Sequence, residues 1–133
     1  MHINNSLEEL LTHIAIAADL CIKPWAHSVV DKSPCLVDIN STQQQVDLIL
    51  SIQCRNKEGD RFPENDIEVE IYQSGNDLSI TLSWESFPDK PILWYGNHSL
   101  WMDSTTGKKC QPPKNGSSFE ALARRIRSSF IVI

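Results

Sequence analysis

Hydrophobic and polar residues alternate through the middle of the chain, whereas apolar residues recur at helical spacing near both ends. Between Leu36 and Met102 the apolar positions fall on every second residue, the period of a strand with one dry and one wet face. Breaks rich in Gly, Asn and Pro separate these runs, which is typical of antiparallel strands joined by turns. The alternating runs lie at 46–54, 67–72, 78–85, 92–95 and 99–102, and residues 36–39 could form a short strand.

The first helix is expected between Ser6 and Lys23. Ser6 and Glu9 form a capping box, in which each side chain accepts a hydrogen bond from the other residue's backbone N–H. Lys23 ends the helix because a residue before proline disfavours helical backbone angles. Residues 24–35 are interpreted as a loop. The apolar stripe of this helix consists of Leu7, Leu10, Leu11, Ile14, Ala18 and Cys21.

A second helix is expected after a loop from Ser104 to Gly116 that is rich in Gly and Pro. Ser117 and Glu120 form another capping box at its start. The apolar residues 130–133 predict that the end of the chain docks into the core or onto a neighbouring molecule. The stripe of this helix consists of Phe119, Leu122, Ala123, Ile126 and Phe130.

These elements predict the fold class. We expect an α+β domain with a single antiparallel sheet of four to six strands, and with the N- and C-terminal helices packed on one face. The 133 residues fit one domain spanning residues 1–133, because the chain shows no internal repeat and no linker.

Composition favours a soluble cytoplasmic protein. Apolar residues make up 41% and charged residues 22%, which is ordinary for a globular chain. The first 22 residues lack the pattern of a signal peptide, and no run approaches the roughly 18 apolar residues that would cross a membrane. The four cysteines have no metal or redox spacing, so we interpret them as reduced small hydrophobes, with two disulfides as the alternative.

Charge is unevenly distributed around the net value of −5. Residues 1–103 hold 6 basic and 16 acidic side chains, whereas residues 104–133 hold 6 basic and 1 acidic. Arg124, Arg125 and Arg127 give the second helix a basic face. Their stems could lie along the sheet and reach the acidic face of the same molecule. Alternatively they could meet an anionic protein or ligand; the net negative charge argues against nucleic acid.

Known catalytic patterns are missing from the sequence. It has no nucleophile elbow, no phosphate-binding glycine loop and no paired histidines at metal-ligand spacing. Glu68 and Glu70, with Asp47 opposite, could hold a cation or transfer protons, but alternating acids more often keep a strand face solvated. We therefore assign no catalytic residue, metal ligand or cofactor, and an enzyme is disfavoured.

The segment "ILWYGNHSLWMD", residues 92–103, is the strongest candidate for a binding surface. Gly96-Asn97 predicts a hairpin turn, and both faces of the hairpin carry large apolar groups, so one face needs a cover or is exposed for binding. Trp94 and Trp101 could be cross-strand neighbours. The tryptophans could instead be core anchors, but aromatic residues and Met are enriched at interfaces. The candidate binding residues are Trp94, Tyr95, His98, Trp101 and Met102, with Arg124, Arg125 and Arg127.

The order of capped helix, strand meander with "ILWYGNHSLWMD" and capped helix resembles small uncharacterised α+β domains catalogued in cyanobacteria as domains of unknown function. It also looks like the helix–sheet–helix plan of small secretion chaperones. The resemblance implies a non-catalytic role and no particular site residues. We expect a non-enzymatic binding or adaptor domain that recognises another protein or a second copy of itself. The alternative is a small-molecule binder or enzyme with a pocket between sheet and helices.

Overall fold

The computed structural model describes residues 7–33 and 45–130, without the side chains of residues 45 and 46. Ser6 of the first capping box, the expected strand at 36–39 and the apolar residues 131–133 lie outside this description.

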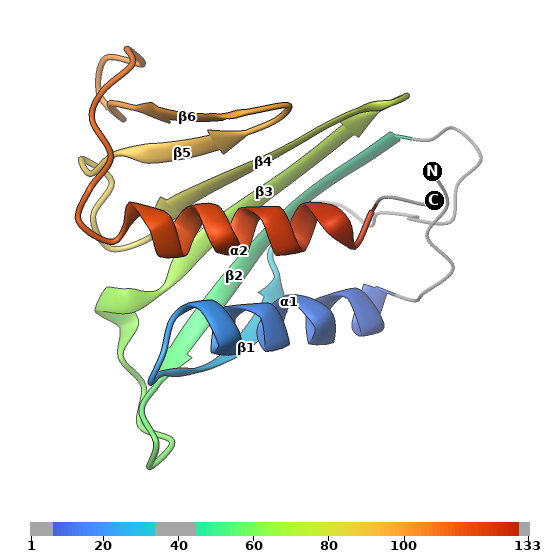
Figure 1. Cartoon of the computed structure of the whole chain (residues 1–133). Coiled ribbons are helices and arrows are strands. Elements are labelled where there is room, and N and C mark those ends of the chain that lie inside the picture. The colour runs from blue at the N-terminus through green and yellow to red at the C-terminus, as the bar shows by residue number, and fades with distance from the viewer. Residues whose placement is uncertain (1–6, 34–44, 131–133) are drawn as a thin grey trace.

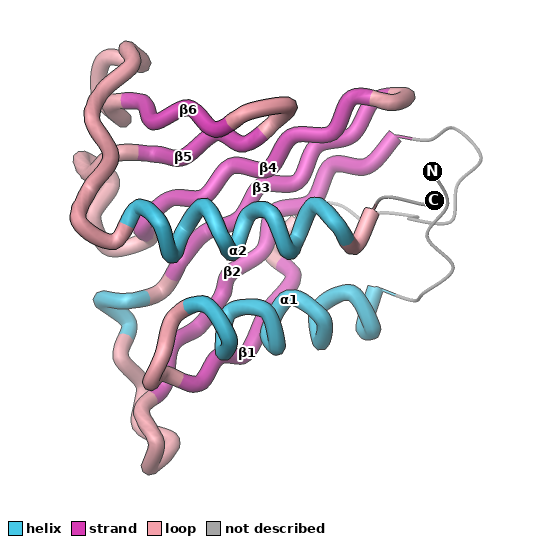
Figure 2. The backbone as a smooth tube through the Cα atoms, in the orientation of Figure 1, coloured by secondary structure: helices cyan, strands magenta, loops and turns pink. Residues whose placement is uncertain are grey.

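Six antiparallel strands form one open sheet in the order β1-β2-β3-β4-β5-β6, a simple meander. Both helices lie on the same face of this sheet, as Figures 1 and 2 show. The expected α+β fold is therefore confirmed. The elements are α1 (Leu7–Cys21), β1 (Ala26–Asp31), β2 (Gln45–Arg55), the short 3-10 helix η1 (Pro63–Asn65), β3 (Ile67–Ser74), β4 (Asp77–Trp84), β5 (Ile92–Tyr95), β6 (Ser99–Met102) and α2 (Gly116–Ser128).

The core lies between the sheet and the two helices. Alternate residues of β2, β3 and β4 are buried while those between them are more exposed, as the two-residue period predicts, with Ser51 of β2 as an exception at 1% exposure. The helical stripes meet this face, and full burial of each large aliphatic side chain contributes about 1.5–3 kcal/mol to folding. Side chains at 0–1% exposure include Ile14, Leu48, Leu50, Val69, Ile80, Leu82, Leu93, Phe119, Leu122, Ile126 and Phe130.

The interpretation of residues 24–35 as a loop is wrong, because Ala26–Asp31 form β1, which pairs with residues 50–55 of β2. The segment looks unlike a strand because His27 and Ser28 interrupt it and two valines stand side by side. Val29 packs against the core and Val30 is 42% exposed on the other face. Pairing with β2 and packing against α1 form this strand, and neither is visible in a local pattern.

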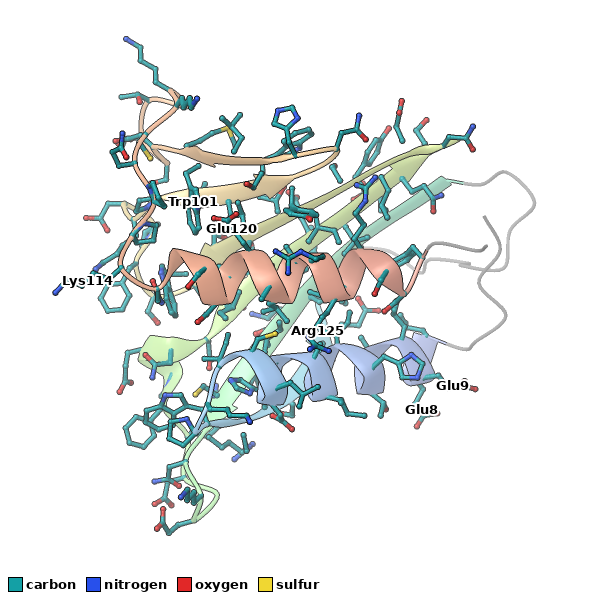
Figure 3. The ribbon with its side chains drawn as sticks, viewed as in Figure 1. Glu8, Glu9, Trp101, Lys114, Glu120 and Arg125 are labelled. Carbon is teal, nitrogen blue, oxygen red and sulfur yellow. The ribbon has the colours of Figure 1, made fainter. Side chains whose placement is uncertain are left out.

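The prediction of a second capping box by Ser117 and Glu120 is also wrong. Asn115 occupies the cap position of α2, and its side chain makes no capping hydrogen bond. Glu120 is turned toward the sheet, where its Oε1 accepts a hydrogen bond from Trp101 Nε1 at 3.2 Å (Figure 3). The buried indole N–H of Trp101 needs a partner, and Glu120 supplies it in place of a cap.

A salt bridge between Arg61 and Asp66 stabilises the connection between β2 and β3. The Asp66 carboxylate accepts hydrogen bonds from Arg61 at 2.9 and 2.6 Å and from the Cys54 backbone N–H at 2.8 Å. Burial alone would raise the pKa of Asp66, but the bonds from Arg61 and Cys54 outweigh burial and hold that pKa below its usual range. Burial, reinforced by the charge of Asp66, raises the pKa of the Cys54 thiol.

Candidate binding face

The sheet face opposite the helices is covered by no element that the structure describes, and it carries the surplus apolar groups of the hairpin. In β5 and β6, Leu93 and Trp101 are buried toward the helices, so alternation turns their neighbours to the other face. These neighbours are only half-buried. We call them the β5–β6 patch: Ile92, Trp94, Leu100 and Met102.

The strand register joins this patch to an acidic region in the middle of the same face. Trp94 lies opposite Leu100 on one side and Thr81 on the other, and Thr81 lies opposite Glu70. Glu68 points to the same face two residues from Glu70 on β3, and Asp47 lies on β2 diagonally across from Glu70. Asp47 pairs with Tyr72 and not with a glutamate. The open face is therefore apolar at the β6 edge and acidic along β3 and at Asp47, with Lys32 beside Glu68 at one end.

A hollow opens in this face where β4 and β5 separate. Their ladder spans only Ile80–Leu82 of β4, and the strands diverge beyond it. The hollow has a volume of about 280 Å³, and its lining includes Tyr72, Ser79 and Trp94. Tyr72 is 44% exposed, so the hollow is bordered by one exposed and one half-buried aromatic ring. A hollow of this size accepts a single large side chain.

Trp94 is held over the hairpin turn by contact with the backbone. A β-carbon built on Gly96 would lie 2.3 Å from the Trp94 ring, so only glycine lets the indole approach this closely. The imidazole of His98 meets the ring edge-on at a centroid distance of 6.2 Å. Gly96 and His98 therefore position Trp94 beside the hollow.

Arg127 braces the same region from the helix side. Its Nη1 donates hydrogen bonds to the carbonyl oxygens of Leu78 and Gly96, each at 2.7 Å. Both residues line the hollow, and both lie beyond the last ladder pair of β4 and β5. The guanidinium thus replaces strand-to-strand hydrogen bonds where the strands diverge. The sequence left two interpretations of the arginines, contacts within the same molecule or contacts with an anionic partner. Arg127 makes contacts within the molecule, although its partners are backbone carbonyls and not acidic side chains.

The remaining predicted residues are divided between the two faces. Trp101 is 5% exposed and stacks on Phe119 at 6.1 Å between ring centroids, so it belongs to the core. The prediction that Trp94 and Trp101 are cross-strand neighbours is wrong, because Trp101 pairs with Leu93. Tyr95 is half-buried and packs against the core. The structure therefore brings together Trp94, His98 and Met102 but separates them from Tyr95 and Trp101.

Arg124 and Arg125 lie elsewhere. Both are exposed on α2, and Arg125 projects on the side of α2 that turns toward α1 (Figure 3). The helices cover the sheet face opposite the β5–β6 patch, so these two side chains share no surface with Trp94. Only Arg127 reaches the candidate face, and it does so through backbone groups.

Sequence reasoning missed Tyr72 and the hollow beside it. The sequence did offer one signal. In the run 67–72, Ile67, Val69 and Ile71 face the core, so the alternation places the aromatic ring of Tyr72 on the opposite face. The divergence of β4 and β5 has no sequence signal, because it depends on the register of strands and on an arginine 31 residues beyond Gly96.

Other chemistry receives no support among the residues that the structure describes. Within 7–33 and 45–130, no group of three or more His, Cys, Asp or Glu side chains could hold a metal ion. Cys21, Cys54 and Cys110 are free thiols, and Cys35 lies outside the description. In the same ranges, neither helix is long and apolar enough to cross a membrane.

Two helices on one face of an open meander, with an apolar patch and a hollow on the other face, define a two-layer α+β domain. The chain belongs to the family described as Domain of unknown function (DUF8659), whose family model matches residues 11–129. Searches of curated proteins and of solved structures gave no match. The resemblance to α+β domains of unknown function is confirmed by the family match, while its cyanobacterial setting and the likeness to secretion chaperones stay predictions.

Proposed function

We propose that this domain is a non-enzymatic adaptor that binds another protein through its open sheet face. The observation that supports the proposal is the 280 Å³ hollow between Tyr72 and Trp94, next to the half-buried β5–β6 patch. Contiguous apolar side chains that no described element covers are typical of an interaction surface. A large apolar side chain of the partner would fill the hollow and act as the anchor of the interface.

Charge indicates what surrounds that anchor in the partner. Asp47 and Glu70 are exposed and Glu68 is half-buried on the middle of the same face. Acidic side chains beside an apolar patch favour a partner that carries lysine or arginine near its apolar anchor. Binding should therefore weaken as the salt concentration rises, because salt screens exposed charges.

A second copy of the chain is a less suitable occupant of this face. A two-fold symmetric dimer presents the same surface from both subunits. Two copies joined about an axis near Glu70 would bring the acidic side chains of both subunits close together, which costs free energy. A different protein avoids this repulsion.

The small-molecule alternative would require a cavity between the sheet and the helices. The side chains at that interface, including Ile80, Leu93, Phe119 and Leu122, are at 0–1% exposure and pack against one another. Dense packing of this kind leaves little room for a ligand. This observation favours the adaptor over an enzyme with an interior pocket.

Site-specific photo-crosslinking tests the proposal. A photoreactive phenylalanine analogue replaces Tyr72, which tolerates another ring because it is 44% exposed. The matched control carries the analogue at Ile16, which is 52% exposed on α1 in the other layer. Both variants are irradiated in the cells that make the protein, and the adducts are identified by mass.

A discrete adduct with one protein from position 72, and its loss in a double variant that also carries Trp94→Ala, would support the adaptor. An adduct of twice the chain mass would identify a second copy as the partner and contradict the proposal of a different protein. Equal adduct patterns from positions 72 and 16, or no adduct from either position, would also contradict it.

A further inference from the structure

A cavity of about 400 Å³ lies at the end of the sheet beside the start of α2, away from the hollow at Trp94. Three segments that are far apart in sequence line it: η1, the loop after β4 and the residues just before α2. Its volume falls in the range of small-molecule sites and is too small for a folded partner.

Aromatic side chains form two of its walls. Trp84 is half-buried, and its ring lies 4.8 Å between centroids from the fully buried ring of Phe119, which fixes its position. Phe87, in the loop that follows β4, also lines the cavity and is 40% exposed. Two flat rings that border one cavity suit a ligand that is itself flat and apolar on its faces.

Hydrogen bonds tie two of the three segments together and close the turn of the third. Ser86 Oγ donates to the Pro63 carbonyl at 3.0 Å, which joins the loop after β4 to η1. The Glu85 N–H donates to the Asp66 carbonyl at 3.2 Å. The Gly116 N–H donates to the Pro113 carbonyl at 3.0 Å and closes the turn before α2. The cavity therefore exists before any ligand enters, which lowers the entropic cost of binding.

The charged side chains of the lining are Lys90, Lys114 and Glu64, which leaves a net charge of +1. Lys90 Nζ lies 5.5 Å from the centre of the Phe87 ring, a cation–π distance that holds the ammonium at the cavity. Lys114 is exposed at the rim, in the loop that leads into α2 (Figure 3). Two lysines at such a rim favour an anionic group in the ligand. Residues 1–103 as a whole carry more acidic than basic side chains, so a positively charged rim is unusual for this chain.

We propose that this cavity binds a small organic acid that carries a flat aromatic ring. The ring lies between Trp84 and Phe87, and the acid group faces Lys90 and Lys114. The cavity shares no lining residue with the hollow at Trp94. A neighbouring hollow, lined by Phe87, Lys90 and Ile92 among others, separates it from the β5–β6 patch.

Titration of the ¹⁵N-labelled protein with 1-naphthoate, followed by NMR, tests this site. We expect saturable shifts of the Trp84 indole N–H and of the backbone amides near Lys114. The neutral analogue 1-naphthamide has the same rings without the charge, and we expect it to bind about fivefold or more weakly. Equal affinities for the two probes, or shifts centred elsewhere, would overturn the proposal, as would the absence of saturable shifts.

Variants separate the two contributions. Lys114→Gln should weaken 1-naphthoate about fivefold and leave 1-naphthamide unchanged. Lys108→Gln, in the same basic segment but outside the lining, should change neither. Phe87→Ala should weaken both probes, and its exposed position avoids the folding risk of changing Trp84. If Lys114→Gln and Lys108→Gln weakened 1-naphthoate equally, general charge and not this cavity would account for binding.

Discussion

The indole ring of Trp94 rests against the backbone of Gly96, so closely that a β-carbon at position 96 would lie 2.3 Å from the ring. Trp94 thereby stays beside the hollow at the β4–β5 divergence, half-buried and without a described layer above it. The position of this one ring links the hairpin turn to the proposed binding face.

Gly96→Ala should displace the Trp94 ring. The closest atoms belong to the far end of the indole, which can rotate away, so we expect a loss in the free energy of unfolding of about 1–2 kcal/mol and not unfolding of the domain. The displacement is measured as a shift of the Trp94 indole N–H signal in the ¹⁵N NMR spectrum.

Gly75→Ala is the matched control. Gly75 has φ of +62°, and a β-carbon added there would meet nothing within 4 Å, so the substitution strains the backbone without touching a ring. An unchanged Trp94 signal in Gly96→Ala, or an equal shift in both variants, would show that the glycine does not position the indole.

Arg127→Ala should destabilise the domain by about 2 kcal/mol. It removes two 2.7 Å hydrogen bonds from a charged donor and leaves the carbonyls of Leu78 and Gly96 without that partner. Arg124→Ala, at an exposed position of the same helix, should stay within about 0.5 kcal/mol of the wild type. Urea denaturation measures both, and equal effects would contradict the bracing role of Arg127.

Asp66→Asn should lower the free energy of unfolding by about 2 kcal/mol near neutral pH, because hydrogen bonds to charged groups contribute about 1.5–3 kcal/mol. The pKa of Asp66 is lowered in the folded protein. The contribution of its charge is therefore fully present above the unfolded pKa of about 3.9 and is lost as the pH falls through the lower folded pKa.

The stability difference between wild type and Asp66→Asn should accordingly be constant between about pH 5 and pH 7 and shrink below about pH 4. Chemical denaturation across this pH range measures it. A difference that stayed the same, or grew, in acid would show that the Asp66 charge is not what holds Arg61 and Cys54.

Glu120→Ala should cost about 1 kcal/mol, since it leaves the buried indole N–H of Trp101 without its partner. Glu120→Gln keeps an acceptor oxygen and should cost less than half of that. If the two substitutions were equally destabilising, the hydrogen bond from Trp101 would not be the reason why Glu120 leaves the capping position.

Much of the fold follows from short-range patterns. Alternation in 46–54, 67–72 and 78–85 predicts which residues of β2, β3 and β4 face the core, because one sheet face is buried by helices. The stripe from Phe119 to Phe130 likewise predicts the buried face of α2. In contrast, β1 depends on its pairing with β2, and so the residues around His27 do not predict it.

The binding features depend on contacts between distant segments. The pattern in 92–102 predicts a hairpin with apolar groups on two faces, and Leu93 and Trp94 do point in opposite directions. The hollow itself requires Arg127 to reach Gly96, and the lysine-lined cavity requires residues near 64, 87 and 114 to meet. No local periodicity encodes such meetings, and only the tertiary structure reveals them.

Oxidative footprinting of the unaltered protein tests the binding face most directly. Hydroxyl radicals modify exposed aromatic and sulfur side chains, so Tyr72, Trp94 and Met102 report on the face. Trp25, which is half-buried beside Phe62 and belongs neither to this face nor to the lysine-lined cavity, serves as the internal control. A bound partner excludes water from its interface. We therefore expect modification of the three face residues to be about threefold lower in intact cells than in the purified protein, with Trp25 less affected. Equal modification of Tyr72, Trp94 and Met102 in the two settings would contradict a protein-binding role for this face.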